Sequence, residues 1–227
     1  TLPEEFPVLN GMKFMEPCLK TSFYDGTRDL DLQYLTHDLQ NNAKRLRITF
    51  NDKHYLFYLH LYYQIYEAEN IVEKWCEVEN RDPHNMVLIE RIFSGNLCLP
   101  GNSDYHIVHT WGKWNNEMNI ADDRLVHGKV VLESRRITSS HQHNPSAVFY
   151  NGKLTEFEGE GYSVSLGWSG NWELVAEKNS FNLTRISVGI NDWDFQMQLK
   201  PQQAYQSPSM FFSYTSGGLH NISLHWH

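Results

Sequence analysis

Cysteine is scarce in this sequence. Only Cys18, Cys76 and Cys98 are present, an odd number with no Cys-x-x-Cys spacing. A disulfide framework needs an even set of cysteines, and a zinc ribbon needs closely spaced pairs. The sequence therefore predicts reduced, buried thiols, with no disulfide framework and no zinc ribbon.

Positive charge is also in short supply. The chain has 19 Lys and Arg residues against 27 Asp and Glu residues, which gives a net charge of -8. Binding to nucleic acid requires a clustered excess of Lys and Arg, so the composition argues against such a partner. No apolar run approaches the length that spans a bilayer, and no charged-then-apolar leader opens the chain. These absences predict a cytoplasmic protein with no nucleic acid partner and no membrane partner.

The motifs of several enzyme classes are missing. The nearest approach to a Gly-x-Ser-x-Gly nucleophile elbow is Gly167-Trp168-Ser169-Gly170, whose spacing is wrong, and Gly-x-Gly-x-x-Gly is absent. Neighbouring carboxylates such as Asp122-Asp123 face opposite ways on a strand, whereas a glycosidase needs two carboxyl groups flanking one sugar bond. We therefore assign no catalytic residue, no cofactor and no metal.

Aromatic and strand-forming residues are abundant. Hydrophobic residues make up 41% of the chain and aromatic residues 14%, against 20% charged, which is typical of a packed globular protein rich in strands. Strand-like runs and turns recur at short intervals, and Asp25-Gly26 is a strong hairpin signal between the first two runs. The pattern predicts one all-β domain over residues 1–227, an antiparallel sandwich. The expected strands are 19–23, 29–35, 46–50, 55–66, 71–79, 86–93, 97–99, 105–114, 129–133, 147–150, 162–168, 172–177, 184–190, 195–199 and 209–214.

The segment Ser134 to Pro145 concentrates polar side chains at a junction between two strands. If it is extended, Arg135 and Arg136 point to opposite faces, so that one of them needs an acceptor. The pair His141 and His143 would then share one face, a spacing that a metal site on a sandwich can use. The other interpretation is that both imidazoles brace a turn before the proline.

Three tryptophans are the candidates for sugar contact. Trp168, Trp172 and Trp193 stand close to Gly, Asn and Asp, a composition that leaves indole faces open for stacking on sugar rings while amides and carboxylates bond hydroxyls. The alternative interpretation is that these side chains complete the core, where each contributes about 2 to 3 kcal/mol.

Several segments resemble one known family. Ser134 to Pro145, which includes His141, His143 and Asn144, resembles the Ser-Arg-Arg-Gly-Ala-Ser-Ser-His-Gln-His-Asn-Pro segment of glycoside hydrolase family 36 α-galactosidases. The stretch Tyr162 to Trp172 is similar to the Gly-x-Ser-x-x-Tyr-Ser-Gly-Asn stretch of that family. Arg185 to Phe195 is similar to its Gly-Ile-Asn-Pro-Phe-Asp-Phe strand and turn. The resemblance covers nearly the whole chain.

The resemblance implies an antiparallel β-supersandwich of the galactose-mutarotase-like type, with few short helices. In the family this domain precedes a catalytic (β/α)8 barrel that carries both catalytic aspartates, within motifs such as Lys-Trp-Asp-Met-Asn-Arg, and this sequence contains no such motif. The central motif has Ile137-Thr138 where the family has Gly-Ala, and Asp192-Trp193 where it has Pro-Phe. Local turn geometry is expected to differ at both places.

The resemblance thus predicts the non-catalytic N-terminal domain of an α-galactosidase, a retaining hydrolase of terminal α-galactosides such as melibiose and raffinose. Its partners would be the catalytic barrel of the same polypeptide and, in a homo-oligomer, further copies of the protein. Residues Arg135, Arg136, His141, His143 and Asn144 are assigned to a structural motif. Two alternatives stay open at this point: a free-standing carbohydrate-binding module, and a metal-dependent sandwich enzyme that uses His141 and His143.

Overall fold

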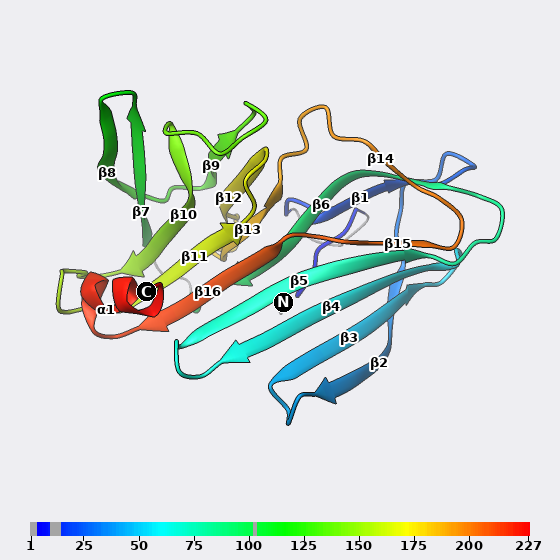
Figure 1. Cartoon of the computed structure of the whole chain (residues 1–227), viewed down its shortest axis with the longest axis horizontal. Helices are drawn as coiled ribbons and strands as arrows, with labels where there is room; N and C mark the ends of the chain where they lie inside the picture. Colours follow the sequence, from blue (N-terminus) through cyan, green and yellow to red (C-terminus); the bar gives the residue numbers. More distant parts are fainter. Residues whose placement is uncertain (1–3, 10–14, 102–103) are drawn as a thin grey trace.

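The computed structural model describes residues 4–9, 15–101 and 104–227 of the chain. In this part the chain forms sixteen strands and one short helix (Figure 1). The first eight strands are β1 (Leu19–Ser22), β2 (Leu32–Gln40), β3 (Arg45–Asp52), β4 (Phe57–Tyr66), β5 (Ile71–Asn80), β6 (Val87–Cys98), β7 (Tyr105–Lys113) and β8 (Asn116–Arg124). The others are β9 (Gly128–Ser134), β10 (His143–Asn151), β11 (Gly161–Gly167), β12 (Trp172–Lys178), β13 (Thr184–Ile190), β14 (Met197–Leu199), β15 (Gln203–Gln206) and β16 (Ser209–Thr215), followed by helix α1 (Gly218–His225).

The strands of the described residues form two antiparallel sheets. The small sheet has the order β1-β6-β13-β12-β9, with β14 also paired to β6. The large sheet has the order β2-β3-β4-β5-β16-β11-β10-β7-β8, with β15 also paired to β5. The predicted all-β antiparallel sandwich with few short helices is therefore confirmed.

The hydrophobic core lies between the two sheets, in two clusters. In one cluster Leu59 and Leu61 of β4 pack with Ile89 and Ile92 of β6, and in the other Phe149 of β10 packs with residues such as Leu174 and Ile186. Alternation along the strands produces this arrangement, because successive side chains point to opposite faces of a sheet. Each fully buried large apolar side chain contributes about 1.5 to 3 kcal/mol.

The predicted hairpin at Asp25-Gly26 is wrong. The turn exists, with the backbone N–H of Gly26 donating to the carbonyl of Phe23 at 2.9 Å, but the strands that follow and precede it do not pair. Strand β1 pairs with β6 in the small sheet and β2 pairs with β3 in the large sheet. An Asp-Gly turn reverses the chain locally, and here the reversal leads from one sheet to the other.

Other differences from the predicted elements are local. The runs 86–93 and 97–99 form the single strand β6, whose register against β13 shifts at a bulge between Val188 and Gly189. Cys18 and Cys76 are buried and Cys98 is half-buried. Within the described residues, no helix has the length and apolar content that crossing a membrane requires.

Candidate binding surface around the loop between β13 and β14

The loop of residues 191–196, between β13 and β14, separates two concave surfaces. Its backbone is held by local hydrogen bonds: the N–H of Trp193 donates to the side-chain Oδ1 of Asn191 at 2.9 Å, and the N–H of Phe195 donates to the backbone carbonyl of Asp192 at 3.2 Å. Asp194 adopts a left-handed conformation with φ 54°. As a result Asp192 takes part in a polar hollow on one side, while Trp193 lines an aromatic groove.

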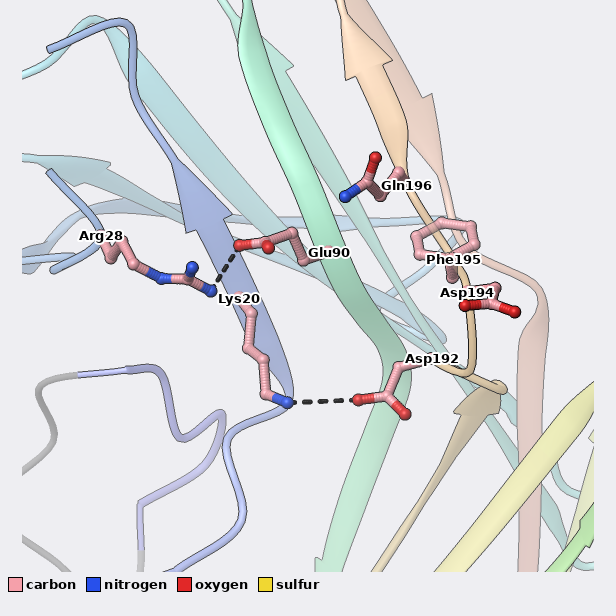
Figure 2. Close-up of a pocket in the computed structure, with 7 residues that line it drawn as sticks. All are labelled: Lys20, Arg28, Glu90, Asp192, Asp194, Phe195 and Gln196. Atoms are coloured by element: carbon pink, nitrogen blue, oxygen red, sulfur yellow. Dashed lines mark hydrogen bonds and ion pairs between the residues drawn. The ribbon is translucent and has the colours of Figure 1, made fainter. Parts of the chain in front are cut away.

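The polar hollow, drawn in Figure 2, has a volume of about 460 Å³. Four of the charged side chains that line it form opposite-sign pairs: Lys20 Nζ lies 3.2 Å from Asp192 Oδ2, and the guanidinium of Arg28 contacts the carboxylate of Glu90. The buried guanidinium of Arg91 also contacts Asp192. The hollow is therefore an ion-pair cluster that ties β1 and β6 to the loop.

The same cluster continues inward through Glu16. Its carboxylate contacts both Arg91 and Lys129, and its backbone N–H donates to Glu177 Oε2 at 2.9 Å. Burial raises the pKa of Glu16, but the hydrogen bonds and charges of Lys129 and Arg91 outweigh it and lower that pKa to about 2. These contacts fix the segment before β1 against the small sheet.

Glu173 is a buried acid on the same side of the small sheet. It pairs across the strands with Glu133 of β9 and is 8% exposed. Burial is the main cause that raises its pKa to about 6; Arg91 opposes the shift, and the nearby carboxylates of Asp192 and Glu133 add to it. Among the described residues its carboxylate makes no direct ion pair, so it is a source of instability when ionised.

The aromatic groove lies on the other side of the loop and has a volume of about 360 Å³. Trp168 and Trp193 both line it, with exposed fractions of 41% and 57%. The guanidinium of Arg135 lies 4.1 Å from the ring centre of Trp193, a cation–π contact that fixes the indole. Trp168 is fixed differently, because its Nε1–H donates to the carbonyl of Asn171 at 3.1 Å. Two of the three predicted sugar-contact residues are thus brought together.

The prediction for Trp172 is wrong. This side chain is fully buried in the core between the sheets, with Leu174 and Ala176 of the same strand. Its position on β12 points it inward, while the alternate residues Glu173 and Glu177 point to the opposite face. No sugar can reach it in this structure.

The junction between β9 and β10 is not extended at Arg135 and Arg136, so the condition under which these side chains would point to opposite faces of a strand is not met. Strand β9 ends at Ser134, whose Oγ donates to the carbonyl of Thr138 at 2.6 Å. Arg135 finds its acceptor in Glu133, with Nε to Oε2 at 2.8 Å, and Arg136 is exposed. Ile137 is 87% exposed and has a φ of 70°. This backbone conformation is strained for a β-branched residue and costs about 1 to 2 kcal/mol.

The two histidines of the motif are not on one strand face. His141 is exposed in the turn, whereas His143 begins β10 and is half-buried, with its ring centre 5.5 Å from that of His109. Burial, and then the charge of His109, lower the pKa of His143. Asn144 Nδ2 donates to Thr110 Oγ1 at 2.8 Å and so ties β10 to β7.

A metal site finds no support in this arrangement. Among the residues that the structure describes, no three His, Cys, Asp or Glu side chains are grouped so that they could hold a metal ion. The metal-dependent enzyme, which required a third ligand beside His141 and His143, therefore has no structural basis in this part of the chain.

Reasoning from the sequence missed several residues of this surface. The partner of His143 is His109, which lies 34 residues earlier and is brought close only by strand pairing. Glu173 and the cluster around Arg91 gave no local signal. For Ile137 the signal was present, since the family motif has glycine there, the residue that adopts positive φ without strain.

Fold and surface together define a class of protein: a two-sheet antiparallel β-sandwich that presents ion-paired and aromatic concave surfaces. Within that class the comparison with known families is specific. Residues 1–200 match the Glycosyl hydrolase family 36 N-terminal domain, and the chain belongs to this family.

The relatives are α-galactosidases. The chain is 30% identical to α-galactosidase AgaA of Geobacillus stearothermophilus, covering 100% of this chain and 33% of that protein. It is 27% identical to α-galactosidase Mel36A of Lactobacillus acidophilus, again over 100% of this chain and 33% of the relative. The chain thus spans about a third of the length of these relatives.

Solved structures show the same fold. The AgaA variant of G. stearothermophilus in complex with stachyose superimposes with a TM-score of 0.93 at 29% identity, over 99% of this chain and 33% of that chain. The α-galactosidase of Lactobacillus brevis superimposes with a TM-score of 0.91 at 27% identity, over 96% of this chain and 32% of that chain.

Proposed function

We propose that this chain is the non-catalytic N-terminal part of an α-galactosidase whose catalytic barrel belongs to the same polypeptide. The observation that carries the proposal is that the chain matches the N-terminal domain of the family. It also spans only about a third of the length of its relatives. The role of the chain would be to support the barrel.

The substrate class follows from the relatives. Structures of AgaA are described in complex with stachyose and with raffinose, both of which carry terminal α-galactose. We propose that the whole protein hydrolyses such α-galactosides, melibiose included, with retention of configuration.

A structural role for this chain is supported by the pairing of its acids. Asp192 and Glu90 are held by Lys20 and Arg28, and Glu16 is held by Arg91 and Lys129. Carboxylates with these partners stabilise the sandwich and are poorly placed to act as nucleophile or proton donor. The predicted homo-oligomer and the predicted cytoplasmic location stay predictions.

The experiment that tests the activity is galactose release from raffinose by the full-length protein. Release of galactose and sucrose supports the proposal. A full-length protein that leaves raffinose, melibiose and stachyose intact contradicts it, because the substrate class would then be wrong.

Sugar contact in the aromatic groove is a second candidate function, favoured by the convergence of Trp168 and Trp193 on one concave surface. Titration of the purified chain with raffinose, followed by tryptophan fluorescence, tests it. Trp168→Ala and Trp193→Ala would each abolish the fluorescence change. Trp114→Ala is the matched control, because that indole is 79% exposed outside the groove. A change that persists in both groove variants would exclude this site.

A further inference from the structure

The large sheet has an outer face, which we define as the face turned away from the small sheet. The register places a row of side chains on it: Val108 of β7 pairs with Val148 of β10, which pairs with Ser163 of β11, which pairs with Ser213 of β16. Their neighbours along the strands, such as Ile107 and Phe149, point inward to the core. Within the described residues α1 is the helix that covers this face, at one end.

Helix α1 is attached to the outer face by specific contacts. The Nε1–H of Trp226 donates to Ser163 Oγ at 3.2 Å, and the ring of Trp226 meets that of Phe211 edge-on with centres 6.4 Å apart. Ile222 is buried, and the absence of a side chain at Gly161 makes room for it, since a Cβ there would lie 3.0 Å from Ile222 Cδ1. Helix α1 and Trp226, near the end of the chain, therefore lie against this face (Figure 1).

Beside α1 the outer face is hollowed rather than filled. This apolar hollow has a volume of about 460 Å³, and it is lined by Val108, Ile120 and Val148 of the sheet, by Leu219 and Ile222 of the helix, and by Trp226, which follows the helix. Ile120 on the edge strand β8 is 75% exposed, and its neighbour Met118 is 64% exposed. A concave apolar surface on a helix–sheet junction, rimmed by exposed large side chains, is typical of an interaction site.

We propose that the apolar hollow is the docking surface for the polypeptide that follows His227 in the full-length protein, and that apolar side chains of that polypeptide fill it. The inference rests on the proposed function, since it takes the catalytic part to lie after this chain. Three observations support this occupant. The relatives are three times as long as the chain, α1 forms one wall of the hollow, and Trp226, next to the last residue described, lines it.

Continuity along the chain favours this occupant over a second copy of the protein or a small apolar ligand. A segment joined directly to α1 has a high effective concentration at the hollow, so modest apolar contacts are enough to keep it bound. A separate copy would have to supply the whole association free energy through the same small surface.

Photo-cross-linking in the full-length protein tests the proposal. A benzoylphenylalanine placed at position 120 lies on the rim of the hollow, and the same residue at position 24 is the matched control, because Tyr24 is 61% exposed on the turn after β1. Mixing ¹⁴N- and ¹⁵N-labelled protein distinguishes links within one chain from links between copies. Mass spectrometry then identifies the linked peptides.

We expect position 120 to form links within one chain to peptides that follow His227, at a yield about tenfold above that of position 24. Links between copies, or a yield from position 120 no higher than that from position 24, overturn the proposal. Galactose release from raffinose is measured on the same samples. If that activity is present without the links, only the docking surface is wrong; if the activity is absent, the proposed function fails first.

Discussion

Two glutamates on β12 are predicted to have opposite effects on stability when each is changed to glutamine. Glu173 and Glu177 lie four residues apart on β12, so their side chains are on the same face of the sheet, and both are largely buried. Glu177 accepts from Arg185 at 3.1 Å and from the backbone N–H of Glu16, whereas Glu173 is raised in pKa by burial and has no direct ion-pair partner among the described residues.

The magnitude for Glu173 follows from its pKa. Since that pKa is about 6 in the folded protein against an ordinary value of 4.5, ionisation of Glu173 destabilises the fold by about 2 kcal/mol above pH 6. The contribution of Glu173 to the free energy of unfolding is therefore most favourable below pH 4.5, where the carboxyl is protonated, and it is lost as the pH rises through 6. Glu173→Gln should therefore raise the free energy of unfolding by about 2 kcal/mol at pH 8 and leave it unchanged at pH 4.

Urea denaturation of the purified chain at pH 4, 6 and 8 measures this directly. Glu177→Gln is the matched control on the same strand, and it should lower stability by about 3 kcal/mol at pH 8, because it removes the charge that compensates buried Arg185. A Glu173→Gln variant that is less stable than the parent at pH 8, or equally shifted at pH 4 and pH 8, would refute the reasoning.

The remaining predictions concern the N-terminal contact, the strained turn and one glycine. Glu16→Gln should cost about 3 kcal/mol at neutral pH, with the loss shrinking from pH 4.5 towards pH 2 as the parent carboxylate is protonated, and a pH-independent loss in urea unfolding would contradict this. Ile137→Gly should raise stability by about 1 kcal/mol because the φ of 70° is then unstrained, and an unchanged or lower urea midpoint would contradict it. Gly189→Ala should destabilise by about 1 to 3 kcal/mol, since its Cβ would lie 2.5 Å from Phe93 Cα, and a thermal midpoint equal to that of the parent would count against this.

The strands were largely predictable from the sequence because burial between two sheets imposes a period of two. The run Tyr55 to Tyr66 illustrates this: alternate residues such as Leu59 and Leu61 are buried in β4. The sequence could not predict how the strands on either side of Asp25-Gly26 pair. The residues of a turn specify a reversal of the chain, but they carry no information about which sheet the strand before the turn and the strand after it will join.

The candidate site was predictable only in part. Trp172 could have been assigned to the core, since Trp172, Leu174 and Ala176 alternate with Glu173 and Glu177 in the way that a strand with one apolar face does. The groove shared by Trp168 and Trp193 depends on two loops that meet through sheet pairing, and no local pattern reports such contacts. The same holds for the ion pairs that join Glu16 to distant strands.

The measurement that tests the central claim most directly is hydrolysis of a chromogenic α-galactoside by the chain of residues 1–227, side by side with the full-length protein at equal concentration. The account predicts turnover by the full-length protein and none by residues 1–227. Release of the chromophore by residues 1–227 alone would contradict it, because the chemistry would then lie in this sandwich.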